Sequence, residues 1–244
     1  MRVKLIVAYD GTAYHGWQIQ NNGISVQQVL NETISEFFGQ EIKVVGASRT
    51  DTGVHAKGNV AAFDVDTKMP AEKIAYALNR SLPDDIVITE SSEVPADFHP
   101  RFHKGRKTYE YRILNRTFPD PVRRHYSLFY HYPLDEKKMN EAAQYLVGEH
   151  DFTTFSSIHS QSATFVRTVY VCEVSRRGDE ILLHIEGNGF LYNMVRIITG
   201  TLLEVGGGRM EPSHVGEILE KKDRSLAGPT APPEGLTLIG IEYL

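Results

Sequence analysis

Cysteine, tryptophan and long apolar runs are scarce in this chain. Cys172 is its one cysteine, so no disulfide can form within the chain, a pattern typical of proteins in a reducing compartment. No apolar run approaches the roughly 18–20 residues that a membrane-spanning helix needs. The opening Met1-Arg2-Val3-Lys4 has no signal-peptide pattern. We therefore expect a cytoplasmic protein that does not bind membranes, with Cys172 as a small buried strand residue rather than a nucleophile.

A net positive charge is also missing, since the formal charge is −5, and bulk attraction to nucleic acid is not predicted. The distribution of charge is more informative. Residues 101–125 contain eight basic and two acidic side chains with aromatic residues between them. Cations beside rings that can stack on bases are what RNA binding requires. A solvated strand-and-loop surface explains the same composition equally well.

The first part of the chain has the order strand, helix, two strands, helix, strand. Residues 3–9 have strand composition. Ser25 begins a helix with Gln28 in the capping-box position, and Gly39 ends it. Further strands are predicted at residues 42–45, 59–63 and 86–88, and a second helix at about 70–81.

The second part repeats this order with additions. Strands are predicted at 108–114, near 126–132, and at 167–174 and 181–185, which form a hairpin around Gly178-Asp179. Helices follow Asp135 and span about 190–203 and 213–222, and a strand at 236–243 closes the chain. Two pseudo-repeated split β-α-β units, ferredoxin- or RRM-like, predict an α+β fold. We expect halves 1–104 and 105–244 to form one continuous antiparallel sheet with helices on one face.

A polar loop at residues 46–56 follows the second predicted strand. Gly46 and Gly53 permit backbone turns that other residues resist. Between and beside them stand five polar side chains: Arg49, Thr50, Asp51, Thr52 and His55. From the residues alone, the simpler interpretation is a hairpin whose Asp51 accepts hydrogen bonds from its own loop.

The sequence Ser48-Arg-Thr-Asp-Thr-Gly-Val-His-Ala56 resembles the active-site motif of TruA-type pseudouridine synthases. Other stretches agree in the family's order, and together they cover essentially the whole chain: 9–18, 98–102, 107–112, 150–155 and 190–206. Ser48 and Thr52 stand where the family commonly has glycine and alanine, which affects only the local loop geometry.

The resemblance implies a site of three principal residues. Asp51 matches the family's catalytic aspartate, Tyr109 the tyrosine that packs against the target uracil, and Arg196 the basic residue that pairs with the aspartate. Residues 1–104 would thus carry the aspartate loop, and residues 105–244 would complete the site.

Four neighbouring residues receive weaker assignments from the resemblance. Arg49 is a candidate for contacts with phosphate or RNA backbone, or for a wedge where the target base leaves its stack. Phe190 and Leu191 would supply apolar walls, and His55 is interpreted as structural. Without the resemblance, Tyr109 would be assigned to a cross-strand pair with Tyr111 on the same face of a strand.

Pseudouridine formation breaks the N1–C1′ bond of uridine and joins C5 to C1′ without redox change or net hydrolysis. The resemblance therefore implies that no cofactor and no metal is required. The carboxylate acts as nucleophile or base, and whether it adds to the base, bonds to C1′ or removes a sugar proton stays open. Burial alone would favour its neutral form, whereas an adjacent arginine typically lowers the pKa of an aspartate by about 1–3.

The family implies tRNA as partner, uridines near positions 38–40 of the anticodon stem-loop as targets, and a homodimer. Two rival functions stay open from the residues. A non-catalytic RNA-binding module of RRM-like topology would keep its function after Asp51→Ala. A metal-dependent hydrolase would use Asp51 and His55, with His150 and Asp151, although no recognised ligand spacing such as His-Glu-x-x-His is present.

Overall fold

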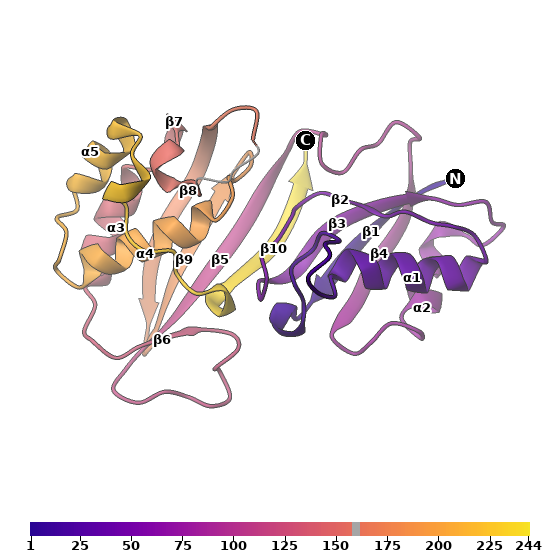
Figure 1. Cartoon of the computed structure of the whole chain (residues 1–244), viewed down its shortest axis with the longest axis horizontal. Helices are drawn as coiled ribbons and strands as arrows, with labels where there is room; N and C mark the ends of the chain where they lie inside the picture. Colours follow the sequence, from indigo (N-terminus) through magenta and orange to yellow (C-terminus); the bar gives the residue numbers. More distant parts are fainter. Residues whose placement is uncertain (158–161) are drawn as a thin grey trace. The chain divides into compact units, whose positions relative to one another are not determined.

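The computed structural model describes residues 1–157 and 162–244, which divide into two compact units (Figure 1). Unit 1 comprises Met1–Gly105 and Thr237–Leu244, and unit 2 comprises Arg106–Leu236. Each unit contains a mostly antiparallel sheet with helices packed on it. The predicted α+β class is thereby confirmed.

The sheet of unit 1 has the strand order β4-β1-β3-β10, with the short β2 on β3. Its strands are β1 (Arg2–Tyr9), β2 (Val45–Gly46), β3 (His55–Asp64), β4 (Ile86–Val94) and β10 (Leu236–Tyr243). Two neighbouring helices, α1 (Val26–Phe38) and α2 (Ala71–Leu78), pack in the same unit. The side chains of β1 are alternately buried and half-buried, so one face of this strand packs against the apolar interior of the unit.

Helix α1 begins where the sequence predicts. The Ser25 side chain accepts a hydrogen bond from the Gln28 backbone N–H at 3.2 Å, and Gly39 ends the helix with φ of 63°. The Nε2 of Gln28 donates to the Glu32 carboxylate one turn further along the helix, at 3.0 Å. Val26, Leu30 and Ile34, spaced four residues apart, are fully buried.

The strand predicted at 42–45 is wrong for most of its length, since only Val45–Gly46 pairs with β3. Side chains of α1 and its surroundings satisfy this backbone instead. The N–H groups of Ile42 and Val44 donate to Ser35 and Asn31, both at 2.9 Å. Backbone N–H groups that already donate to side chains do not need partners in a neighbouring strand.

Strand β10 has the predicted bounds but groups with unit 1, whereas the sequence places residues 236–243 in the second half. It pairs with β3 through Thr237↔His55 and Leu238↔Ala56, and this pairing is parallel rather than antiparallel. Close packing reinforces it, because a Cβ at Gly58 would lie 2.8 Å from the Ile239 carbonyl oxygen. The C-terminal segment thus supports the strand that follows the polar loop.

The sheet of unit 2 has the order β5-β9-β8-β7, with β6 parallel to β5. Its strands are β5 (Gly105–Asn115), β6 (Leu128–Tyr130), β7 (Gly148–Asp151), β8 (Val166–Arg177) and β9 (Glu180–Gly187). The predicted β8–β9 hairpin is confirmed, with Gly178 at φ of 61° in its turn. Strand β7 is an addition to the predicted order.

Three helices cover one side of this sheet: α3 (Glu136–Gln144), α4 (Met194–Gly206) and α5 (His214–Lys221) (Figure 1). Helix α4 starts at Met194 rather than near residue 190, because Asn193 adopts a left-handed conformation with φ of 60°. Nearly all of α4 is buried, and at Gly200 a Cβ would lie 1.7 Å from the Pro229 carbonyl oxygen. The segment 228–231 therefore lies directly on α4.

Cys172 is buried in β8. Burial, and next the charge of Glu173, raise the pKa of its thiol to about 12, so little nucleophilic thiolate exists at neutral pH. The structural interpretation of this cysteine is confirmed. Across residues 1–157 and 162–244, the helices are too short or too polar to span a bilayer.

Candidate active site

The polar loop joins β2 to β3 in unit 1 and turns sharply after Asp51. The Val54 N–H donates to the Asp51 carbonyl at 3.1 Å, and Gly53 within this turn has φ of 78°. A positive φ at the third position is what a type II turn requires, and glycine meets it without strain. Asp51 is half-buried at the start of this turn.

A buried amide in β3 holds the start of the loop. Asn59 is fully buried, and its Oδ1 accepts from the Ser48 N–H at 3.3 Å while its Nδ2 donates to the Ser48 carbonyl at 3.0 Å. Nδ2 also lies 3.3 Å from the Tyr9 hydroxyl, which shares a 2.7 Å hydrogen bond with Thr50. The residues on the N-terminal side of Asp51 are therefore fixed to β1 and β3 at two points.

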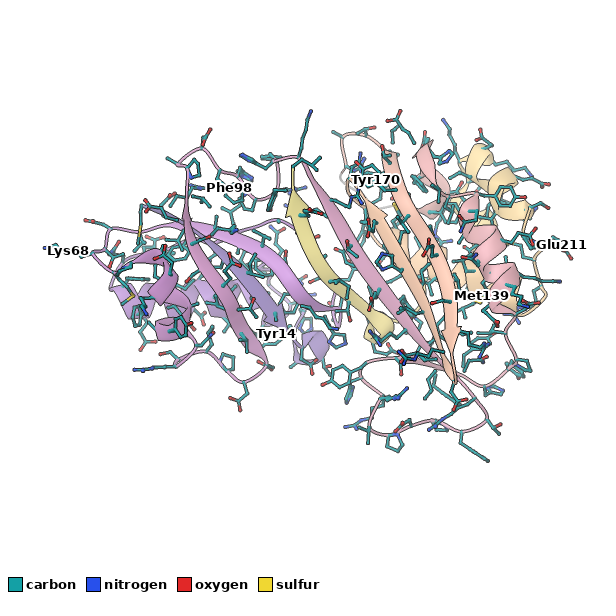
Figure 2. All side chains as sticks on the ribbon, turned by 180° about the vertical axis from the view of Figure 1, so that it is seen from behind. Tyr14, Lys68, Phe98, Met139, Tyr170 and Glu211 are labelled. Atoms are coloured by element: carbon teal, nitrogen blue, oxygen red, sulfur yellow. The ribbon has the colours of Figure 1, made fainter. Side chains whose placement is uncertain are left out.

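The N-terminal segment holds the loop from its other side. The Trp17 N–H donates to the Thr50 carbonyl at 3.1 Å, and the Gly53 N–H donates to the Tyr14 carbonyl at 3.3 Å. Gly16 permits this approach, because a Cβ there would lie 2.3 Å from the Thr50 oxygen. Tyr14, labelled in Figure 2, is itself fixed by a 2.5 Å hydrogen bond to Asp85.

His55 lies at the start of β3 and is 5% exposed. Its Nδ1 accepts from the Gly11 N–H at 3.0 Å, with the Asp10 carboxylate 3.1 Å away. A Cβ at Gly11 would lie 2.1 Å from the Val54 carbonyl oxygen. His55 thus joins the N-terminal segment to the end of the loop, which is a structural contact of the kind expected for it.

Arg49 is exposed on the same loop, two residues before Asp51. Partial burial, and next the charge of the neighbouring Arg101, lower the pKa of its guanidinium. Two guanidinium groups held near each other in unit 1 repel, and an anion between them would relieve that repulsion. Its predicted role in contacting phosphate stays a prediction.

In unit 2, Tyr109 lies in β5, opposite Ile185 of β9, and is 6% exposed. Its ring meets the ring of Phe190 edge to face, with centroids 5.3 Å apart and planes at 85°. Tyr111 lies on the same face but is fully buried and donates its hydroxyl hydrogen bond to the Pro232 carbonyl at 2.7 Å. Phe190, from the segment before α4, thus packs against Tyr109, which agrees with its expected place in an apolar wall.

Arg196 lies in the first turn of α4 and is half-buried. Its Nε donates to the Ala231 carbonyl at 2.7 Å, and its Nη1 donates to the Asn193 Oδ1 at 2.9 Å. The Ala231 N–H returns a bond to the Arg196 carbonyl at 3.0 Å. Two hydrogen bonds on a planar guanidinium fix both its position and its plane.

Comparison with known proteins shows the family of the chain. A family model described as tRNA pseudouridine synthase matches residues 5–103 and 142–244. This chain belongs to that family. The matched ranges contain Asp51 and Arg196, whereas Tyr109 lies in the interval between them.

Relatives within the family match along nearly the whole chain. A "tRNA pseudouridine synthase A" of Thermoanaerobacter sp. (strain X514) is 51% identical over 241 residues, which is 99% of each chain. Proteins with the same name from Acetivibrio thermocellus and Exiguobacterium sp. are 47% and 45% identical, and they too cover 99% of this chain and 99% and 98% of their own lengths. The family resemblance predicted from the motifs is confirmed.

The basic stretch at 101–125 is less positive in this pseudouridine synthase than its composition indicates. At least four of its arginines pair with carboxylates, several of them from β9 or the turn before it: Arg106 with Glu186, Arg112 with Glu110 and Glu180, Arg116 with Asp120 and Asp179, and Arg123 with Asp120 and Glu180. Arg106 also lies 4.8 Å from the ring of Tyr170 (labelled in Figure 2). The count by sequence included Glu110 and Asp120 but missed Asp179, Glu180 and Glu186, because these three acids lie far from the stretch in the chain.

Arg101 and Lys104 differ, since both are exposed and neither forms an ion pair within the part of the chain that the structure describes. Their loop is anchored in unit 1, where the ring of Phe98 meets that of Tyr243 at 5.2 Å and the Tyr243 hydroxyl donates to the Pro100 carbonyl at 2.6 Å. Between them Phe102 is 75% exposed. This loop therefore offers an exposed ring flanked by exposed cations.

The residues invoked for a metal-dependent hydrolase have other partners. The Asp151 side chain accepts from the Thr153 N–H at 3.0 Å and pairs with Lys222 at 2.9 Å. His150 Nε2 lies 3.0 Å from the Val147 carbonyl oxygen. Among residues 1–157 and 162–244, no group of three or more His, Cys, Asp or Glu side chains is placed to hold a metal ion.

Sequence reasoning missed Asn59 and Asn193, the two amides that hold the loop and the arginine. A polar residue directly before the apolar run 60–63 of β3 was the available signal for Asn59. For Asn193 the signal was an asparagine just before an apolar helical pattern, where left-handed conformations are tolerated.

Replacing Asn59 by alanine tests the anchoring of the loop. Both hydrogen bonds to Ser48 are lost in a fully buried place, so we expect the free energy of unfolding to fall by about 1–3 kcal/mol and uridine isomerisation to fall at least about tenfold. Urea denaturation and a turnover assay on the same preparation measure the two effects.

Asn79→Ala is the matched control. Asn79 makes the same pair of bonds to the backbone of Ile88, both at 2.8 Å, but in a different part of unit 1. Because Asn79 is exposed whereas Asn59 is fully buried, this variant should lose less stability, and it should keep its turnover. Equal loss of turnover in both variants would show that stability alone, and not the loop, is affected.

Proposed function

We propose that this chain isomerises uridine to pseudouridine in the anticodon stem-loop of tRNA, near positions 38–40, with Asp51 as its catalytic carboxylate. Membership of the tRNA pseudouridine synthase family is the observation that carries the proposal. The anchoring of the loop supports the assignment of Asp51, because a reactive carboxylate must be held in one place relative to the ribose. The RNA-binding module without catalysis is not favoured by these relatives.

The reaction needs one carboxylate and a means of keeping it ionised. Asp51 would meet the ribose–base junction as nucleophile or base. By the family resemblance Arg196 would pair with it, and two hydrogen bonds hold the Arg196 guanidinium in one orientation. An opposing cation offsets the effect of desolvation, which otherwise favours the neutral acid. The N1–C1′ bond breaks, C5 joins C1′, N1 gains a proton, and the proton from C5 leaves to water.

Tyr109 would receive the extruded uracil. A base within a stacked helix exposes neither C1′ nor C5 to a side chain, so the nucleotide must leave the stack. A ring that stacks on a base contributes about 1–3 kcal/mol. The edge of Phe190 against Tyr109 supports this role, because it fixes the tyrosine ring before the base arrives.

Asp51→Asn tests the catalytic assignment. With tRNA carrying tritium at C5 of its uracils, the wild type should release label to water, and mapping of modified sites should place it near positions 38–40. The variant keeps the shape of the side chain but has no charge, so its rate should fall by about 10³-fold or more.

Asp66→Asn is the control, because Asp66 is exposed and its hydrogen bonds to Gln40 use only its backbone. It should match the wild type. Release of label by the Asp51 variant at the wild-type rate would refute Asp51 as the catalytic residue, while retention of tRNA binding would show that the variant is folded.

The loop of Arg101 and Lys104 would contact the RNA backbone. Replacing both by glutamine should weaken tRNA binding and reduce the slope of log K against log salt by about 2, because each phosphate contact contributes slightly less than one. Fluorescence anisotropy between 50 and 200 mM salt, concentrations over which such contacts weaken strongly, measures both quantities.

Arg112→Gln removes a cation that is already paired with Glu110 and Glu180. It should leave the salt slope unchanged. If instead the slope responds to Arg112 and not to Arg101 and Lys104, the RNA lies on a different surface.

We further propose, from the family resemblance, that the protein acts as a homodimer in the cytoplasm. Light scattering at micromolar concentration should give twice the 27.5 kDa of one chain. A mass of one chain, with full activity at the same concentration, would rule out an obligatory dimer.

A further inference from the structure

Asn193 occupies a backbone conformation that glycine adopts more easily. Its φ of 60° and ψ of 8° place it in the left-handed region immediately before α4. Within the described part of the chain, Lys222 at φ of 54° is the one other non-glycine residue with positive φ. A strained residue of this kind persists where its surroundings require it, and such residues gather at functional sites.

The side chain of Asn193 makes two hydrogen bonds. Its Oδ1 accepts from Arg196 Nη1 at 2.9 Å, and its Nδ2 donates to the Ser157 Oγ at 2.8 Å. The Ser157 N–H also donates to the Tyr192 carbonyl at 3.1 Å. The amide therefore connects Arg196 to Ser157, which follows the short helix η2 (Thr153–Phe155).

Arg196 is held on its other side by the segment 228–231. The Ala231 carbonyl accepts from Arg196 Nε, and Gly200 allows this segment to lie against α4. The Thr201 hydroxyl accepts from the Gly228 N–H at 2.9 Å and fixes the segment further. The guanidinium is thus held between Ala231 and Asn193.

The turn at Asn193 also sets where the wall of the site lies. Phe190, three residues before it, contacts Tyr109 edge to face, and Arg196 follows three residues after it. A right-handed residue at position 193 would extend α4 backward and move Phe190 away from Tyr109. One backbone conformation therefore places both groups.

From this geometry we infer that Asn193 is a positioning residue for the isomerisation, which holds the Arg196 guanidinium in one orientation through its Oδ1 acceptor. This inference rests on the proposed function of Arg196. Asn193 itself would touch neither the uracil nor the ribose, so its effect on turnover must pass through the arginine.

Asn193→Gly separates the side chain from the backbone. Glycine keeps the left-handed turn without strain and removes both hydrogen bonds. We expect kcat for tritium release to fall about 10–100-fold, because small misplacements of catalytic groups have effects of this size. KM should stay within about threefold, since substrate contacts are retained.

Lys222→Gly is the matched control, because it makes the same change at the other left-handed residue and removes a surface ion pair with Asp151. Surface ion pairs contribute little, so kcat should equal that of the wild type. Thermal unfolding of both variants checks that each is folded.

A double-mutant cycle with Arg196→Ala decides whether the effect passes through the arginine. If it does, Asn193→Gly should change kcat less than about twofold in the Arg196→Ala background. An undiminished effect in that background, or wild-type kcat for Asn193→Gly, would overturn the inference.

Nitrogen-15 NMR of the arginine side chains gives a readout that does not depend on activity. In the wild type, the held Arg196 guanidinium should show separate, slowly exchanging Nη signals, assigned by their loss in Arg196→Lys. In Asn193→Gly these signals should merge or exchange rapidly. Unchanged signals would also overturn the inference, whereas a wild type that releases no tritium would contradict the proposed function alone.

Discussion

The hydrogen bonds between the Asn59 amide and the Ser48 backbone are the contact on which the loop of Asp51 depends. They form in a fully buried part of β3, where an unsatisfied peptide group is costly. Any movement of the loop away from β3 would break both of these hydrogen bonds. These hydrogen bonds hold the loop in addition to the burial of its apolar residues Ala47 and Val54.

Close backbone approach completes this anchoring from the N-terminal side. Gly11 and Gly16 bring residues 11–17 against the loop at distances that a Cβ would block. The tyrosine between them, Tyr14, is fixed by Asp85 at the start of β4. Three separate segments of unit 1 thus converge on one turn, and the carboxylate at its start has little freedom to move.

Unit 2 uses similar means for Arg196. A side-chain amide on one side and a backbone carbonyl on the other fix a charged group in the first turn of a buried helix. The surface arginines of residues 106–123 instead form ion pairs, largely with acids of β9 and its turn, which neutralise their charge. The net charge of −5 is then compatible with RNA binding through a small number of exposed cations.

The sequence determined the α+β class, the bounds of α1 and β10 and the β8–β9 hairpin, because periodicity, caps and turn residues are local signals. The family followed from the resemblance of its motifs. The sequence also led us to propose Asp51, Tyr109 and Arg196 as site residues, through motifs whose roles come from resemblance. Tertiary structure decided the remainder. The loss of the strand at 42–44 to side-chain bonds from α1, the grouping of β10 with unit 1 and the neutralised arginines all depend on contacts between distant residues. The same holds for the partners of Asn59 and Asn193, because the partner of a buried polar group is set by packing and not by its neighbours in the chain.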